Sequence, residues 1–239
     1  MSKIYLLTLS AIIFIGVGYF ISKNDIYFAP KLAVAETVDN TSEPTTPEKE
    51  KEETKSDTSI NMDMVKKIHI IGDENAPIKI DKIVSLSCSH CATYHKMVHP
   101  QIKKNFIDTG KAYMVYHDFP TNAPSLYASS LARCLPEKQF FRYIDLLFKT
   151  QHSWVHDHEN YEKKLKQSAT LAGISKDMAE KCINNEKIHE HLINNIKEMQ
   201  KKYEIKSTPT FIINNGEEII SGVRPYSEME VILNKYLPE

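Results

Sequence analysis

The sequence lacks an excess of charge of either sign, and this absence excludes one large class of function. Its 239 residues carry 30 lysines and arginines against 31 aspartates and glutamates, which gives a formal net charge of −1. A protein that binds nucleic acid usually has a basic surplus that neutralises phosphates. We therefore predict no nucleic-acid partner.

Cysteine is also scarce, and no internal repeat is visible. The four cysteines, at positions 88, 91, 134 and 182, are too few for a miniprotein built on disulfides. A composition that is 41% apolar and 26% charged can bury a sizeable core, which excludes wholesale disorder and a polytopic membrane protein. The length fits one domain with an appendage. The sequence thus presents one close and one distant cysteine pair.

The first 22 residues are predicted to be a signal peptide or a membrane anchor. Lys3 precedes an uncharged run from Ile4 to Ile21, and Lys23 follows it. The run lies between the h-region of a cleaved signal, about 7–15 residues, and a span of about 18 apolar residues. An Ala-x-Ala motif ends at Ala35, rather far from the run. Both alternatives export the rest of the chain, and a buried N-terminal helix is disfavoured because the run is not amphipathic.

A polar linker is predicted over residues 23–59. Residues 36–59 read ETVDNTSEPTTPEKEKEETKSDTS, with no aromatic residue and Val38 as the one large aliphatic side chain. Such a segment cannot bury enough apolar surface to offset the entropy of ordering. We therefore expect a disordered tether, followed by a folded domain over residues 60–239.

The folded part reads as strands and helices in an α/β arrangement with a mixed central sheet. Alternating or β-branched runs between turn signals predict strands at Ile68–Ile71, Ile78–Leu86, Lys111–Tyr116, Thr210–Ile213 and Glu217–Ser221. A helix is expected from Ser89, kinked near Pro100 and ended at Gly110. A block of several helices, over residues 120–204 approximately, precedes the last two strands, and a final helix is expected near Ser227–Leu237.

The chemistry is expected at Cys88-Ser89-His90-Cys91, which spans a strand-to-helix junction. The unpaired N–H groups and the positive dipole at a helix N-terminus stabilise a thiolate at Cys88, and a protonated His90 adds a second positive influence. Each unit by which the Cys88 pKa falls is worth about 1.4 kcal/mol, or roughly 30 mV for a two-electron couple. The Cys88–Cys91 disulfide is therefore predicted to be an oxidant.

Zinc is the alternative ligand for this motif. Cys91, His95 and His99 recur every four residues, so a site made with Cys88 has the right ligand types. A single helix can hardly wrap four ligands around one ion, and structural zinc sites usually place the second pair on another segment. We therefore predict no metal and interpret His95 and His99 as solvated or hydrogen-bonded surface residues. A second cluster is also interpreted as structural or surface: His152, His156 and His158.

Pro209, directly before the predicted strand Thr210–Ile213, makes the redox interpretation specific. With the strand ending LSCSHC, the segment STPTFIINNG and the helical insertion between them, the chain resembles the DsbA-like thiol:disulfide oxidoreductases of the thioredoxin superfamily. The resemblance spans about Ile68 to Leu237. It implies a thioredoxin-like mixed sheet flanked by helices, with an inserted all-helical subdomain. Ser89 departs from the strongest oxidases of this family, which often carry proline there.

The resemblance also implies the roles of the site residues. Cys88, Cys91 and His90 are expected to be catalytic, with Cys91 as the resolving thiol. The Thr208–Pro209 bond is expected to be cis, to face the cysteines, and to present backbone to a substrate peptide. Proline has no N–H, and the preceding backbone is free to pair with an extended chain.

The function implied is oxidation of dithiols in the bacterial envelope, by a monomer without a cofactor. Its partners are expected to be reduced exported proteins and a membrane quinone-linked reoxidase, in the periplasm or tethered to the inner membrane. A disulfide isomerase or reductase is an alternative, although isomerases of this superfamily carry a folded dimerisation domain that residues 36–59 cannot supply. A peptide- or zinc-binding module with a structural C-x-x-C is the other alternative.

The distant cysteines, Cys134 and Cys182, lie in the predicted helical insertion. Both would be exported to an oxidising compartment, and neither has another partner once Cys88 and Cys91 pair. We therefore predict a structural disulfide between them. Buried free thiols, acting as small hydrophobic side chains, are the alternative.

Overall fold

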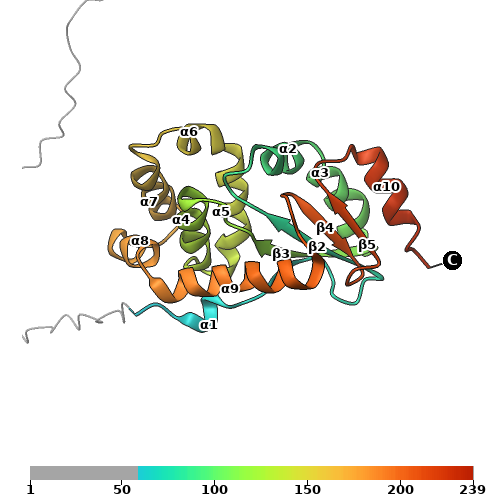
Figure 1. Cartoon of the computed structure of the whole chain (residues 1–239), viewed down its shortest axis with the longest axis horizontal. Helices are drawn as coiled ribbons and strands as arrows, with labels where there is room; N and C mark the ends of the chain where they lie inside the picture. The colour runs from blue at the N-terminus through green and yellow to red at the C-terminus, as the bar shows by residue number, and fades with distance from the viewer. Residues whose placement is uncertain (1–58, 239) are drawn as a thin grey trace, which may run out of the picture. The chain divides into compact units, whose positions relative to one another are not determined.

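The computed structural model describes residues 59–238, and Figure 1 shows their arrangement. The predicted export segment, residues 1–22, and the predicted linker up to residue 58 lie outside the described residues. Within residues 59–238, no helix has the length and apolar character that crossing a bilayer requires.

A mixed sheet of five strands forms the centre of the fold. The strands are β1 (His69–Ile71), β2 (Ile78–Val84), β3 (Ala112–Asp118), β4 (Thr210–Ile213) and β5 (Glu218–Ser221). Their order is β1-β3-β2-β4-β5, with β2 and β3 parallel and the other neighbours antiparallel. Strand β2 lies in the middle, where Ile80 pairs with Met114 on one side and with Ile213 on the other. The predicted mixed sheet is confirmed.

Helices surround this sheet. They are α1 (Met62–Val65), α2 (Ser89–Met97), α3 (His99–Ile102), the π-helical η1 (Lys103–Ile107), α4 (Ala123–Arg133), α5 (Glu137–Lys149), α6 (Gln151–Val155), α7 (Tyr161–Leu171), α8 (Lys176–Ile183), α9 (Glu186–Tyr203) and α10 (Tyr226–Asn234). The single helix predicted from Ser89 to Gly110 is three consecutive segments. The break falls at Val98, because Pro100 has no N–H to donate to the carbonyl four residues earlier and its ring clashes with that carbonyl, whereas a proline is tolerated in the first turn of α3.

The helical insertion comprises α4 to α9 and lies between β3 and β4 in the chain. In Figure 1, α4 to α8 gather beside one end of the sheet, and α9 runs back from them toward the sheet. One cluster of buried side chains fills the insertion and reaches the start of α2, while a second cluster lies between the sheet and the helices α2, α3, η1 and α10. The insertion therefore shares its core with the segment that carries the close cysteine pair.

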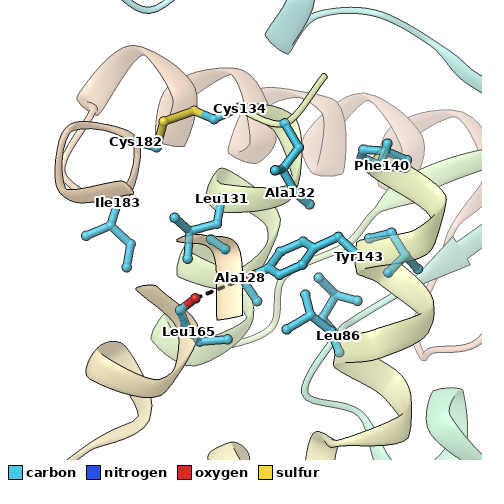
Figure 2. Close-up of a cluster of buried hydrophobic side chains, with 14 of the residues drawn as sticks. Leu86, Ala128, Leu131, Ala132, Cys134, Phe140, Tyr143, Leu165, Cys182 and Ile183 are labelled. Carbon is cyan, nitrogen blue, oxygen red and sulfur yellow. Dashed lines mark hydrogen bonds between the residues drawn. A yellow bond between two sulfur atoms is a disulfide. The ribbon is translucent and has the colours of Figure 1, made fainter. Parts of the chain in front are cut away.

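Cys134 and Cys182 are joined by a disulfide inside the insertion (Figure 2). The bond links the residue after α4 to α8 across 48 positions, with the two Cα atoms 6.4 Å apart. Both side chains are buried, with Leu131 and Ile183 in the same cluster. In the same region the Tyr143 hydroxyl donates to a backbone carbonyl of α7, so the one polar atom of this large ring is satisfied.

A buried ion pair attaches the insertion to the sheet. The guanidinium of Arg133, at the end of α4, lies 2.8 Å from the Asp118 carboxylate at the end of β3, and both side chains are buried. Arg133 also donates to the carbonyl of Lys67, which precedes β1. Separating the two partners would leave an uncompensated charge in the core, so this contact holds α4 against the end of β3.

Candidate active site

Cys88 begins helix α2 at the end of a short turn that follows β2. Its backbone is extended, its N–H donates to the Ser85 carbonyl at 3.1 Å, and its Sγ accepts the N–H of Cys91 at 3.4 Å. A cysteine sulfur therefore takes the capping position usually filled by a serine, threonine, aspartate or asparagine oxygen. This geometry places the sulfur at the positive end of the helix dipole.

The surroundings of Cys88 favour its ionised form. The pKa of its thiol is lowered to about 5, first by the hydrogen bond to the Cys91 side chain, then by Thr208 and by the backbone N–H groups of Cys91 and His90. Partial burial acts in the opposite direction and is outweighed. A group with this pKa is a thiolate at neutral pH, which is the reactive form of cysteine.

Cys91 has the opposite environment, although it lies one helical turn away. Its side chain is fully buried, and its pKa is raised well above the ordinary value by desolvation and then by the hydrogen bond and charge of Cys88. Both cysteines are free thiols in this structure. The motif therefore combines an accessible thiolate with a buried, protonated thiol.

Thr208 and Pro209 lie beside this pair, although they are about half the chain away in sequence. The Thr208–Pro209 peptide bond is cis. In its protonated form the Cys88 thiol donates to the Thr208 carbonyl at 3.3 Å. Strand β4 brings the segment there because it pairs with β2 directly before the turn that carries Cys88.

His90 lies in the first turn of α2 with an exposed side chain. Its backbone N–H is among the groups that lower the Cys88 pKa. The influence expected from a protonated imidazole stays a prediction.

The structure bears out a hydrogen bond for His95, but the expected surface position of His95 and His99 is wrong, because both residues are half-buried. The two rings stack with centroids 5.2 Å apart, and the side chain of His95 is 10% exposed. Helix α5 covers this part of α2, and its Asp145 carboxylate lies 3.0 Å from His95 Nε2. Desolvation is the main cause that lowers the pKa of His95 to about 4 and that of His99 well below its ordinary value. The sequence could not show that a helix from the insertion would pack here.

No other histidine cluster contributes to this site. The side chains of His152, His156 and His158 are exposed, at α6 and the turn after it. Among residues 59–238, no group of three or more histidine, cysteine, aspartate or glutamate side chains is placed to hold a metal ion.

The sequence did not single out two polar residues near the cysteines. Lys82 on β2 is 2% exposed, with its ammonium 5.2 Å from the centre of the Tyr116 ring. Burial lowers the pKa of Lys82 to about 8, and the charge of Cys91 partly offsets this effect. Gln151, on α6, donates to the backbone beside Cys88. For Lys82, the sequence signal was a lysine within the hydrophobic run of β2. For Gln151, the sequence contains no such signal.

Comparison with known proteins identifies the family of this chain. A family model described as Thioredoxin matches residues 64–235. The chain belongs to this thioredoxin family. It is similar to a Rickettsia bellii protein named "Putative protein-disulfide oxidoreductase", with 32% identity over 146 residues, which are 61% of this chain and 56% of the relative. The chain thus spans about half the length of the curated relatives it matches.

Solved structures show the same fold. Wolbachia pipientis alpha-DsbA1 is 27% identical, with a TM-score of 0.65 over 72% of this chain and 91% of that chain. Chlamydia trachomatis DsbA, at 23% identity and a TM-score of 0.58 over 70% of this chain and 89% of that one, shares the fold. The predicted resemblance to DsbA-like proteins and the predicted fold class are confirmed.

Proposed function

We propose that this chain is an exported thiol:disulfide oxidoreductase that introduces disulfide bonds into proteins of the cell envelope through Cys88 and Cys91. The observation that carries the proposal is the asymmetry of the pair: Cys88 has a pKa of about 5, whereas the pKa of buried Cys91 is raised. A stabilised Cys88 thiolate favours the dithiol form of the protein, so the disulfide form is a strong oxidant.

The reaction begins with the Cys88–Cys91 disulfide. A substrate thiolate attacks Cys88 Sγ, a mixed disulfide forms, and Cys91 leaves and takes up a proton because its pKa is high. A second substrate thiolate then attacks the substrate sulfur of the mixed disulfide and expels Cys88 as a stable thiolate. The substrate loses two electrons and two protons: the Cys88–Cys91 pair gains both electrons, one proton ends on Cys91, and the other goes to solvent because Cys88 stays a thiolate.

The burial of Cys91 assists the forward direction. A protonated thiol is a poor nucleophile, so Cys91 attacks the mixed disulfide slowly and the substrate has time to supply its second thiol. The Thr208–Pro209 segment is the proposed docking site for substrate. An extended peptide that pairs with the Thr208 backbone lies beside Cys88 Sγ, which is 3.3 Å from the Thr208 carbonyl.

Export and recycling complete the proposal. The apolar run Ile4–Ile21 is the proposed signal or anchor. We propose that residues 60–239 lie in the periplasm, free or tethered to the inner membrane, and act as a monomer. A membrane quinone-linked partner is the proposed reoxidase, since each turnover leaves the Cys88–Cys91 pair reduced.

The test is oxidation of a reduced, unfolded secretory protein such as ribonuclease A by the disulfide form of the protein. We expect one substrate disulfide per protein molecule, a complete loss with Cys88→Ser, and little change with Ser89→Ala, which keeps the helix and both thiols. Failure of the wild-type protein to oxidise the substrate would contradict the proposal. Faster rearrangement of scrambled ribonuclease than oxidation of the reduced protein would identify an isomerase instead.

A further inference from the structure

Gln151 connects the helical insertion to the turn that carries Cys88. It is the first residue of α6, and its side chain is buried, with the residue 8% exposed. Its Nε2 donates to the carbonyl of Leu86 at 2.8 Å and to the carbonyl of Cys88 at 3.0 Å. One planar amide therefore holds two carbonyls of the same turn.

These two carbonyls belong to the peptide units on either side of Ser87-Cys88. The Leu86 carbonyl is part of a fully buried residue, and leaving it without a donor would destabilise the fold. The Cys88 carbonyl belongs to the first peptide unit of α2 and also accepts the Ala92 N–H at 3.1 Å. Holding both units restricts the backbone dihedrals of Ser87 and Cys88 between them, and so restricts the direction of the Cα–Cβ bond that carries the Cys88 sulfur.

The support behind Gln151 is itself rigid. Helix α6 has five residues, and Trp154 within it is 2% exposed and donates its indole N–H to the Leu147 carbonyl of α5 at 3.2 Å. Helix α5 packs in turn on α2 through the contact of Asp145 with His95. The Gln151 amide thus projects from a held element, as a positioning group requires.

We infer that Gln151 is a positioning residue for the redox site, which holds the turn so that Cys88 Sγ faces the N–H groups at the start of α2. Without its amide the turn loses two hydrogen bonds, and the sulfur samples orientations in which these N–H groups no longer reach it. The importance of Gln151 for thiol oxidation rests on the proposed function. Its effect on the Cys88 thiol does not, because the two hydrogen bonds hold the turn whatever the substrate is.

The experiment replaces Gln151 by methionine, which has nearly the same shape and no donor. We expect the pKa of Cys88, followed by thiolate absorbance, to rise by about one unit, and the equilibrium constant for oxidation of glutathione at pH 7 to fall about tenfold. The matched control is Tyr143→Phe, which removes a buried hydrogen bond between α5 and α7 and none of the hydrogen bonds that hold α6 or the turn. It should lower stability and leave the Cys88 pKa unchanged.

The outcomes separate positioning from general support of the fold. An unchanged Cys88 pKa in a folded, less stable Gln151→Met protein would overturn the inference, as would an equal pKa shift in Tyr143→Phe. If Gln151→Met does not fold, Gln151→Asn, which is too short to reach both carbonyls, should show part of the rise, and no rise would overturn the inference. Because the titration needs no substrate, a shift in a protein that oxidises nothing would uphold the inference and contradict only the proposed function.

Discussion

Cys88 and Cys91 are the same residue type three positions apart, and their thiols differ because one caps a helix and the other enters the core. The Cys88 sulfur meets N–H groups at the start of α2, whereas Cys91 lies among buried apolar side chains. The helix N-terminus at Cys88 could be predicted from the strand-turn-helix pattern. The depth of Cys91 depends on the insertion, whose packing no local pattern specifies.

The first prediction concerns stability and pH in the dithiol and disulfide forms. The folded pKa of Cys88, about 5, lies below the unfolded value of about 8.5. The stabilisation is therefore fully present above about pH 8.5 and is lost as pH falls through 5. Urea unfolding should show the reduced form gaining stability relative to the oxidised form between pH 5 and 8.

A Cys88→Ser variant is the control for this measurement. It keeps a capping oxygen at the start of α2 but has no thiol to ionise. The pH dependence attributed to Cys88 should vanish in it, and an unchanged profile would assign the effect to other groups.

The second prediction concerns Lys82, which is buried without a carboxylate partner among the hydrogen bonds and ion pairs of residues 59–238. Its folded pKa, about 8, lies below the unfolded value of about 10.4. Burying the cation thus destabilises the fold below pH 8, and the penalty fades as pH rises toward 10. Lys82→Met should therefore stabilise the protein at pH 7 by up to about 3 kcal/mol.

The advantage of Lys82→Met should shrink when unfolding is repeated between pH 8 and 10. His95, His99, Tyr116 and Cys91 surround this lysine and are present in both proteins, so their titration largely cancels in the difference. Lys96→Met, on the exposed face of α2, should change stability by less than about 0.5 kcal/mol. A constant advantage across this pH range would show that Lys82 stays protonated in the folded protein as it does in the unfolded chain, and would contradict its lowered pKa.

At the scale of elements, strands and turns were predicted well because their signals are local. Alternating side chains and the Asn214-Asn215-Gly216 turn mark β4 and β5, and both asparagines and the glycine have positive φ as such a turn requires. Pro100 similarly marks the break between α2 and α3. The burial of His95 under α5 was missed because it depends on residues about 50 positions away.

The third prediction compares two glycines that flank the sheet. Gly72, between β1 and β2, has φ +101°, and an added Cβ would lie 2.9 Å from the Ile107 side chain and 3.0 Å from the Ala112 carbonyl. Gly110, before β3, has φ +71° with no atom within 4 Å of an added Cβ. Gly110→Ala should therefore cost about 1 kcal/mol from backbone strain alone.

Gly72→Ala carries the same kind of strain and a backbone clash in addition, so it should cost about 2–4 kcal/mol in urea unfolding. The two alanine variants form a matched pair, since both replace a glycine with positive φ. Equal losses would mean that the turn at Gly72 moves away from η1 and β3 without cost.

At the scale of the whole molecule, the Cys134–Cys182 bond closes 48 residues of the insertion. The chain-entropy model assigns a loop of this length about 4 kcal/mol. The fourth prediction is that a Cys134→Ala, Cys182→Ala protein unfolds at lower urea concentration by about that free energy. Its Cys88 pKa should stay near 5, since neither residue contacts the turn.

Thiol counting tests the same bond in the unmodified protein. Gentle reduction should release two reactive thiols from Cys88 and Cys91, and unfolding in reductant should release two more. Four reactive thiols in the native oxidised protein would contradict the bond.

The order of these parts along the chain matters for biosynthesis. As the polypeptide emerges from its N-terminus, Cys88, Cys91 and Cys134 become available before Cys182, and the Thr208–Pro209 segment comes later still. A nascent chain therefore exposes three thiols while Cys134 lacks its native partner. The sheet also lacks β4 until all six helices of the insertion have been made. In an unfinished chain, Cys88 and Cys91 are therefore present before the Thr208–Pro209 segment that completes their site.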